Sequence, residues 1–225
     1  MTQKERQERS REQIYQAALE EFGMHGYDAV NMEQICTRHS ISKGMMYHYY
    51  SGKDDLFLLC VERTFMGLKT RIEQDMQELP QRDVLHTIKD YFMIREYYFE
   101  LHPLEKGVFE TAVLHTPSQL KEQIITLRAP LQEINRIFLS NQISRMPLRD
   151  GLDRQDVMHY LESVKQLFGS LMRTYRSDMA FDLHAMLDCA EHLLELLLFG
   201  ILRQDTVLST DLKIEGKQTQ KDSQN

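Results

Sequence analysis

The chain has 225 residues, which is enough for one small domain and a larger one with a substantial core. It contains 10 glycines and only 5 prolines, and no stretch alternates convincingly as a strand, so the sequence predicts an all-α protein. The net charge of −7 differs from the basic field usually expected of a nucleic-acid binder, and by itself it neither supports nor excludes DNA binding.

The number and spacing of the cysteines, together with the hydropathy of the chain, indicate the cellular compartment of the protein. Cys36, Cys60 and Cys189 are far apart and odd in number, which favours a reducing environment and gives no zinc spacing. The N-terminus is charged and predicts no signal peptide. The longest apolar run, residues 193–202, is too short to span a bilayer. We therefore expect a cytoplasmic protein without a membrane partner.

A short helix is expected to begin at Asn31. Asn31 is a good N-cap, and Gln34 stands at the spacing that completes a capping box. Arg38 closes this helix near the negative end of its dipole. Residues 39–41 then form a tight turn.

A second helix of about two turns is expected to follow, with Ser42 as its N-cap. Met46 and Tyr50 share a face and are expected to pack inward. The remaining side chains face outward or sideways: Lys43, Gly44, Met45, Tyr47, His48 and Tyr49. This layout is typical of a helix-turn-helix that reads DNA. The alternative is that the tyrosines only seal a small helical domain.

Residues 10–57 resemble the DNA-binding domain of the TetR family of bacterial transcriptional regulators. The matching positions are Ile14, Ala17, Ala18, Phe22, Gly26, Ile35, Ile41, Ser42, Gly44, Tyr47, Tyr50, Lys53 and Leu56. The chain departs from the family's common residues at Asn31, Cys36, His39 and Ser40, where Thr or Ser, Ala, Ala and Gly are usual. The resemblance implies an N-terminal three-helix helix-turn-helix domain and a larger helical domain for ligand binding and dimerisation.

The predicted DNA contacts lie on the second helix and its flanks. We expect Lys43, Met45 and Tyr47 to face the bases. Gly44 allows close approach of the backbone, and Glu33 could accept from a cytosine. Phosphate contacts are expected from Asn31, Ser42, His48, Tyr49 and Lys53. The N-terminal arm adds Lys4, Arg6, Arg9 and Arg11, interleaved with acidic residues.

Prolines and glycines divide the rest of the chain into helices. The expected ranges are 54–79 with a Ser51 and Asp54 cap, 83–101, a shorter helix to 115, one that starts at 116–117, and then 154–175 and 179–203. Pro130 is expected to kink or break its helix. We assign 1–53 to the arm and DNA-binding domain, 54–204 to an effector-binding and dimerisation domain, and 205–225 to a disordered tail.

Aromatic and polar side chains crowd the middle of the chain, as is typical of a ligand pocket. The effector-binding candidates are Tyr91, Arg95, Tyr98, Phe99, His102, Phe109 and His115. A buried Arg95 requires an acidic partner, which is either a ligand carboxylate or one of Glu96, Glu100 and Glu110. The alternative is that the aromatic rings only fill the core.

The first of the last two expected helices carries one apolar stripe, and the second is apolar over more than one face and must bury both faces. The predicted homodimer interface consists of Val157, Leu161, Val164, Phe168, Leu171, Leu187, Leu194, Leu197, Leu198 and Ile201. The TetR resemblance implies the same four-helix arrangement, and the alternative is an intrachain core. His184, Asp188 and His192 share a stripe, which favours a solvated or subunit-facing role over a metal site.

No phosphate loop, nucleophile elbow or paired-carboxylate signature is present, so no catalytic residue or cofactor is expected and an enzyme ranks last. We expect a dimeric transcriptional regulator, most simply a repressor, that binds a palindromic operator in double-stranded DNA and is released by a small-molecule effector. The alternatives are a DNA-binding dimer without an effector, controlled by a protein or structural in role, and a transcriptional activator.

Overall fold

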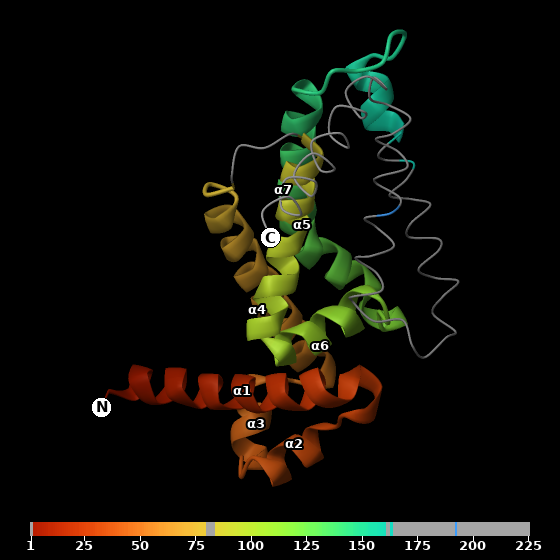
Figure 1. The fold of residues 1–225 in the computed structure, drawn as a ribbon. Helices are drawn as coiled ribbons and strands as arrows, with labels where there is room; N and C mark the ends of the chain where they lie inside the picture. Colours follow the sequence, from red (N-terminus) through yellow and green to blue (C-terminus); the bar gives the residue numbers. More distant parts are fainter. Residues whose placement is uncertain (1, 80–83, 161–162, 164–191, 193–225) are drawn as a thin grey trace, which may run out of the picture. The chain divides into compact units, whose positions relative to one another are not determined.

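The computed structural model describes residues 2–79, 84–160, 163 and 192, and its regular elements confirm the all-α class. They are α1 (Gln3–Ala29), α2 (Met32–Arg38), α3 (Lys43–Tyr49), α4 (Lys53–Asp75), α5 (Val84–Leu101), α6 (Pro103–Val113), a 3-10 helix η1 (Ser118–Leu120) and α7 (Lys121–Ser144) (Figure 1). None of the described helices is long and apolar enough to cross a membrane.

The chain divides into two compact units, which are described separately. The first contains Met1–Leu79 and Tyr91–Asn135, and the second contains Pro80–Asp90 and Arg136–Asn225. Every residue of the expected DNA surface and of the expected effector site falls in the first unit. The predicted domain boundary at residues 53 and 54 stays a prediction.

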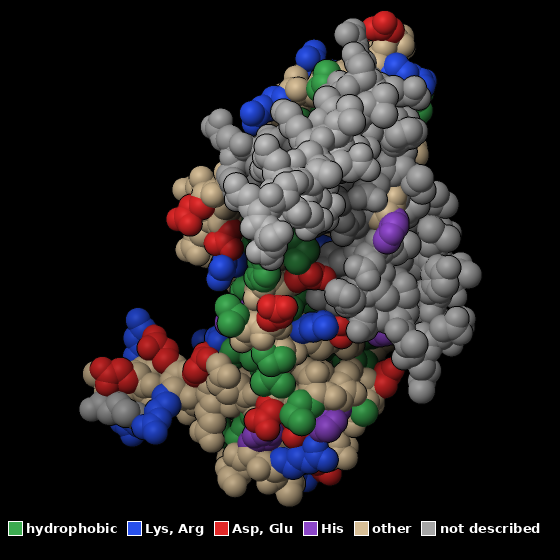
Figure 2. All heavy atoms as spheres, viewed as in Figure 1, with side chains coloured by type: hydrophobic (Ala, Val, Ile, Leu, Met, Phe, Trp, Pro, Cys, Tyr) green, Lys and Arg blue, Asp and Glu red, His purple; other side chains and the backbone are tan. Residues whose placement is uncertain are grey.

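Helix α1 begins with a capping box, in which Thr2 accepts from the Glu5 backbone and Glu5 accepts from the Thr2 backbone. Its first turns are exposed and extend past α3 (Figure 1). Figure 2 shows basic and acidic side chains intermixed on this extension. Further along, Ile14, Ala18 and Phe22 recur at every fourth position and are fully buried, so this stripe anchors α1 in the core.

Gly26 interrupts α1 near its end. Its φ of +72° lies in the left-handed region, which glycine adopts without the steric cost of a Cβ. The interruption directs Tyr27 back onto the core, where its ring stacks on Phe22 at 6.4 Å and meets Phe57 edge-on at 5.1 Å. The glycine therefore positions an aromatic cluster between α1 and α4.

The structure confirms the N-cap residues expected for the two short helices, while the reciprocal Gln34 bond of a capping box is not among the contacts described for α2. Asn31 accepts from the Gln34 N–H at 2.9 Å, and Ser42 accepts from the Met45 N–H at 3.1 Å. In the turn between them Ser40 has a φ of +53°, and the Ile41 N–H donates to the Cys36 carbonyl at 2.9 Å. This is the bonding of a Schellman-type helix end, in which the left-handed residue is commonly glycine.

One expectation about a helix boundary is wrong. Ser51 does not cap α4 with Asp54. The N-cap is Gly52, and Ser51 instead donates through its backbone N–H to Asp55 at 3.2 Å, while Asp54 accepts from Tyr27. Asp55 rather than Asp54 is thus the acid that accepts from Ser51, and it lies in the first turn of α4.

Pro130 does not break its helix. Helix α7 runs from Lys121 to Ser144 with Pro130 inside it. A proline in the interior removes one backbone donor, and the hydrogen bonds on either side of it sustain the helix. Most of the two last predicted helices, 154–175 and 179–203, lie outside the described residues.

Helices α2 and α3 lie on one side of α1, and α6 crosses its other side (Figure 1). Two glycines, Gly23 of α1 and Gly107 of α6, allow these two helices to cross at close range. A Cβ on Gly107 of α6 would overlap the Gly23 carbonyl oxygen, and a Cβ on Gly23 would lie 2.5 Å from the Leu104 carbonyl oxygen. The two backbones are therefore in direct contact, and neither glycine tolerates a side chain.

We predict that Gly107→Ala lowers the free energy of unfolding by about 1–3 kcal/mol, because the new methyl group forces α6 away from α1. Gly44→Ala is the matched control, since a Cβ on Gly44 of α3 meets nothing within 4 Å. That substitution should leave stability unchanged or raise it by up to about 1 kcal/mol. Chemical denaturation measures both, and equal effects would contradict the backbone contact.

Candidate nucleic-acid interface

Helix α3 presents one face to the core and one to solvent. Met46 is fully buried, as expected, and Tyr50 at the end of the helix is half-buried. Lys43, Gly44 and His48 are exposed, and the Tyr47 side chain is 53% exposed. Met45 and Tyr49 are partly buried beside them. The candidate base-facing residues thus surround an accessible face of a helix that is capped at its start.

Lys43 and Glu33 pair with each other across α2 and α3. The Lys43 ammonium donates to the Glu33 carboxylate at 2.5 Å. The hydrogen bond to Lys43 lowers the pKa of Glu33, and the same bond raises the pKa of Lys43. Both side chains are well exposed, and exposed pairs contribute little, so Lys43 can leave Glu33 for a phosphate or a base at small cost.

Arg11 of α1, one of the four basic residues that the sequence analysis placed in the N-terminal arm, joins the surface at the end of α3. Its guanidinium lies 5.3 Å from the centre of the Tyr49 ring, and His48 meets the same ring edge-on at 4.8 Å. The basic residues of the arm were recognisable in the sequence. Which of them reaches α3 depends on how α1 crosses it, and the sequence does not give that crossing.

Lys53 lies where α4 begins, and its environment is more closed than expected. Its ammonium sits 4.0 Å above the centre of the Tyr27 ring. The Tyr27 hydroxyl donates to Asp54 and accepts from the Gln119 side chain at 2.8 Å. Burial, followed by the bond to Asp54, raises the pKa of Tyr27 to about 12. These contacts fix the start of α4 against the end of α1.

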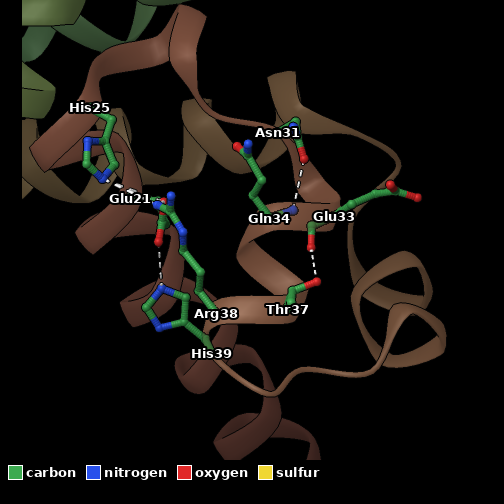
Figure 3. Close-up of polar contacts among 8 residues, drawn as sticks. All are labelled: Glu21, His25, Asn31, Glu33, Gln34, Thr37, Arg38 and His39. Atoms are coloured by element: carbon green, nitrogen blue, oxygen red, sulfur yellow. Dashed lines mark hydrogen bonds and ion pairs between the residues drawn. The ribbon is translucent and has the colours of Figure 1, made fainter.

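Glu21 of α1 holds the end of α2 and the turn (Figure 3). The residue is only 5% exposed. One carboxylate oxygen accepts from Arg38 at 2.6 Å, and the other lies 3.1 Å from His39 Nε2. His25 flanks the cluster, with Nε2 3.4 Å from Arg38 and 4.0 Å from Glu21. A buried carboxylate thus positions the two residues that precede Ser40.

The expected effector residues separate into a buried and an exposed group. Buried are Tyr91, Arg95, Tyr98, Phe99 and Phe109, whereas His102 and His115 are exposed. The Tyr98 hydroxyl donates to Glu105, and burial is the main cause that raises its pKa. Phe109 contacts Phe99 at 4.9 Å and Phe65 of α4 at 5.8 Å. This aromatic cluster joins α4, α5 and α6.

The predicted dimer interface lies almost entirely outside the described residues. Val157 is described and is fully buried within its own chain. The other members, Leu161, Val164, Phe168, Leu171, Leu187, Leu194, Leu197, Leu198 and Ile201, are outside, as are His184 and Asp188 of the predicted stripe. The interface stays a prediction.

Comparisons with known proteins agree with this geometry. Residues 14–60 match the family model of bacterial regulatory proteins, tetR family. The chain is 23% identical over 206 residues to the HTH-type transcriptional repressor NicS of Pseudomonas putida, covering 87% of this chain and 94% of that one.

Two solved structures share the fold. The regulatory protein TetR from Rhodobacter sphaeroides has a TM-score of 0.59 and 14% identity, over 86% of this chain and 99% of that chain. FadR from Bacillus subtilis, solved in complex with stearoyl-CoA, has a TM-score of 0.58 and 19% identity, over 84% of this chain and 98% of that chain.

The fold and the α3 surface define a helical protein with an N-terminal helix-turn-helix. The family model covers that motif, and the likeness to the solved regulators extends over most of the chain. The helix-turn-helix segment of the chain is therefore similar to that of bacterial regulatory proteins of the tetR family.

We predict that Glu21→Gln lowers the free energy of unfolding by about 1–3 kcal/mol, because the charged acceptor of Arg38 and His39 is lost while its shape is kept. Glu20→Gln, at the exposed neighbouring position, removes the same charge and should change stability by less than about 0.5 kcal/mol. Chemical denaturation compares the pair. Equal effects would mean that Glu21 does not anchor the turn.

Proposed function

We propose that this chain is a transcriptional repressor that binds a palindromic operator in double-stranded DNA as a homodimer and is released by a small-molecule effector. The observation that carries the proposal is the exposed face of α3, where Lys43, Tyr47 and His48 are accessible on a helix capped by Ser42. A short, exposed, capped second helix is the part of a helix-turn-helix that enters the major groove.

The proposed contacts follow from these positions. Lys43, Met45 and Tyr47 face the bases, Gly44 permits close approach, and Glu33 accepts from a cytosine once Lys43 has left it. Phosphates are contacted by residues at the ends of α2, α3 and α4, together with one residue of α1: Asn31, Ser42, His48, Tyr49, Lys53 and Arg11.

Dimerisation compensates for the small number of phosphate contacts that one subunit can make. Between Asn31 and Lys53 there are three basic residues against one acid, and the whole chain carries −7. Few phosphate contacts per subunit make the binding of a monomer weak and salt-sensitive. Two subunits place two copies of α3 about one or more DNA turns apart, which requires a palindromic site. The last two predicted helices are the proposed dimer interface.

Effector release is proposed to act through α4. This helix starts at the α1 contact made by Asp54 with Tyr27, and it reaches the aromatic cluster at Phe65. A ligand that moves the cluster changes the spacing of the two α3 helices. A coupling of about 1–3 kcal/mol suffices, which corresponds to a change in DNA affinity of about 5- to 150-fold.

The relatives support repression and ligand control. NicS is named as a repressor, and the FadR structure contains stearoyl-CoA. By analogy we place this chain in the cytoplasm, where it meets both DNA and metabolites. An activator would differ in where its operator lies relative to the promoter. A dimer controlled by a protein would show no thermal shift with any member of a broad metabolite panel.

We predict that Tyr47→Ala weakens specific DNA binding by about 5- to 150-fold, because a base-facing contact of about 1–3 kcal/mol is lost. The measurement is a fluorescence-anisotropy titration on a DNA fragment selected by the wild-type protein. Sedimentation should show an unchanged dimer, since Tyr47 is exposed and distant in sequence from the proposed interface.

Tyr97→Ala is the control for this prediction. Tyr97 of α5 is 54% exposed, against 53% for Tyr47, so both substitutions remove a similarly exposed ring. DNA affinity should be unchanged in the control. If Tyr47→Ala also leaves affinity unchanged, Tyr47 does not belong to the DNA surface.

A further inference from the structure

The first turns of α1, residues 3–11, form a helical arm that extends past α3 (Figure 1). Residues 3–9 are exposed, and the capping box at the start of α1 keeps this end helical. At a rise of 1.5 Å per residue the arm is about 13 Å long, which corresponds to about four base pairs along the axis of DNA. The arm is therefore long enough to reach phosphates beside the DNA that α3 contacts.

Each of the three acids on or next to the arm has a partner inside the protein. Glu5 accepts from a backbone N–H of the cap at 2.8 Å. Glu12, one residue past the arm, accepts from Arg63 of α4 at 2.7 Å, and this bond is the main cause that lowers the pKa of Glu12. Glu8 lies 3.9 Å from Lys4. The alternation of acids and bases in the sequence therefore does not make the arm neutral along its length.

The three arginines of the arm differ from these acids. Arg6, Arg9 and Arg11 are exposed, and within the part of the chain that the structure describes no carboxylate lies at ion-pair distance from any of them. In the helix-turn-helix, by contrast, Arg38 and Lys43 are each paired with an acid. An arginine without an acidic neighbour keeps its N–H donors for other anions, and its planar fork fits the oxygens of a phosphate.

The helical period gives the direction of each arginine. Glu21 marks the side of α1 that faces α2, because it binds the end of that helix. At about 100° per residue, Arg6 points about 60° to one side of Glu21 and Arg11 about 80° to the other, whereas Arg9 points about 120° away. The contact of Arg11 with the Tyr49 ring of α3, at 5.3 Å, agrees with this count. Arg6 and Arg11 thus project toward the side of α1 that carries α2 and α3.

We propose that the arm of α1 is a second DNA-binding element, in which Arg6, together with Arg11, contacts phosphates of the duplex beside the bases that α3 faces. The inference rests on the proposed DNA binding and extends the DNA surface along the double helix. Its contacts are independent of sequence, because a phosphate is the same at every base pair. The arm supplies the unpaired positive charge that the helix-turn-helix lacks.

Fluorescence-anisotropy titrations of the full-length protein test the proposal on two duplexes of equal length, the fragment selected by the wild-type protein and one of unrelated sequence. Arg6→Gln should lower the affinity for the selected fragment by about 5- to 30-fold at physiological salt, because one phosphate contact is lost in each subunit. The slope of log affinity against log salt should become shallower by about two. The affinity for the unrelated duplex should fall by a similar factor.

Three further variants separate a phosphate contact from other effects. Arg6→Lys keeps the charge and should retain most of the affinity, which would not follow if the loss came from a damaged helix. Arg9→Gln removes the same charge from the side of the arm that points away, and should change the slope by less than about one. Tyr47→Ala should weaken binding to the selected fragment and leave the unrelated duplex unaffected.

The outcomes distinguish the arm from the proposed function. Equal losses in Arg6→Gln and Arg9→Gln would indicate general attraction by charge and would overturn the contact. An unchanged slope in Arg6→Gln would overturn it as well, and both results leave DNA binding by α3 standing. A wild-type protein without preference for either duplex, whose affinity still falls in Arg6→Gln, would support the arm and contradict selective binding by α3. A protein that binds neither duplex would overturn both.

Discussion

Three consecutive residues of α1 bind three different helices, and the rest of the first unit depends on this junction. Glu21 accepts from Arg38 of α2, Phe22 meets Phe57 of α4 at 5.1 Å, and Gly23 lies against the backbone of α6. Successive residues of a helix point about 100° apart, so adjacent positions can face three neighbours. The orientation of α2, and through it the turn before α3, is set at the same point as the crossing of α6. In the proposed mechanism, a shift of α4 or α6 is therefore felt directly by the DNA-binding surface.

Electrostatics shape this surface less than packing does. Each of the three basic residues between Asn31 and Lys53 already has a partner inside the protein: Arg38 has Glu21, Lys43 has Glu33, and Lys53 has the Tyr27 ring. Such pairing limits nonspecific attraction to phosphate. An acidic chain with a paired, sparsely basic surface is suited to selective binding rather than to tight binding of any DNA.

Sequence patterns predicted the parts of the fold that depend on local chemistry. The caps at Asn31 and Ser42, the inward Met46 and the all-α class follow from side-chain type and spacing, and the structure confirms them. The same reasoning failed at Ser51, where two neighbouring acids, Asp54 and Asp55, follow one serine and Asp55 is the one that accepts from it.

Contacts between residues far apart in the chain could not be predicted from local sequence patterns. Glu21 looks like any other acid in a charged helix, and only the crossing of α1 and α2 makes it the buried partner of Arg38 and His39. The contact of Arg11 with α3 and the close approach of Gly107 to α1 could not be predicted for the same reason, since each depends on a helix far away in the chain.

The central claim is that α3 presents a sequence-selective surface to DNA, and that two copies of α3, one from each subunit of a dimer, bind together. The most direct test is to select fragments bound by the purified full-length protein from random DNA at physiological salt, and to sequence them. The account predicts enrichment of one palindromic motif, with half-sites spaced by about one or more turns of DNA. A folded dimer that enriches no motif, with or without candidate effectors, would contradict it.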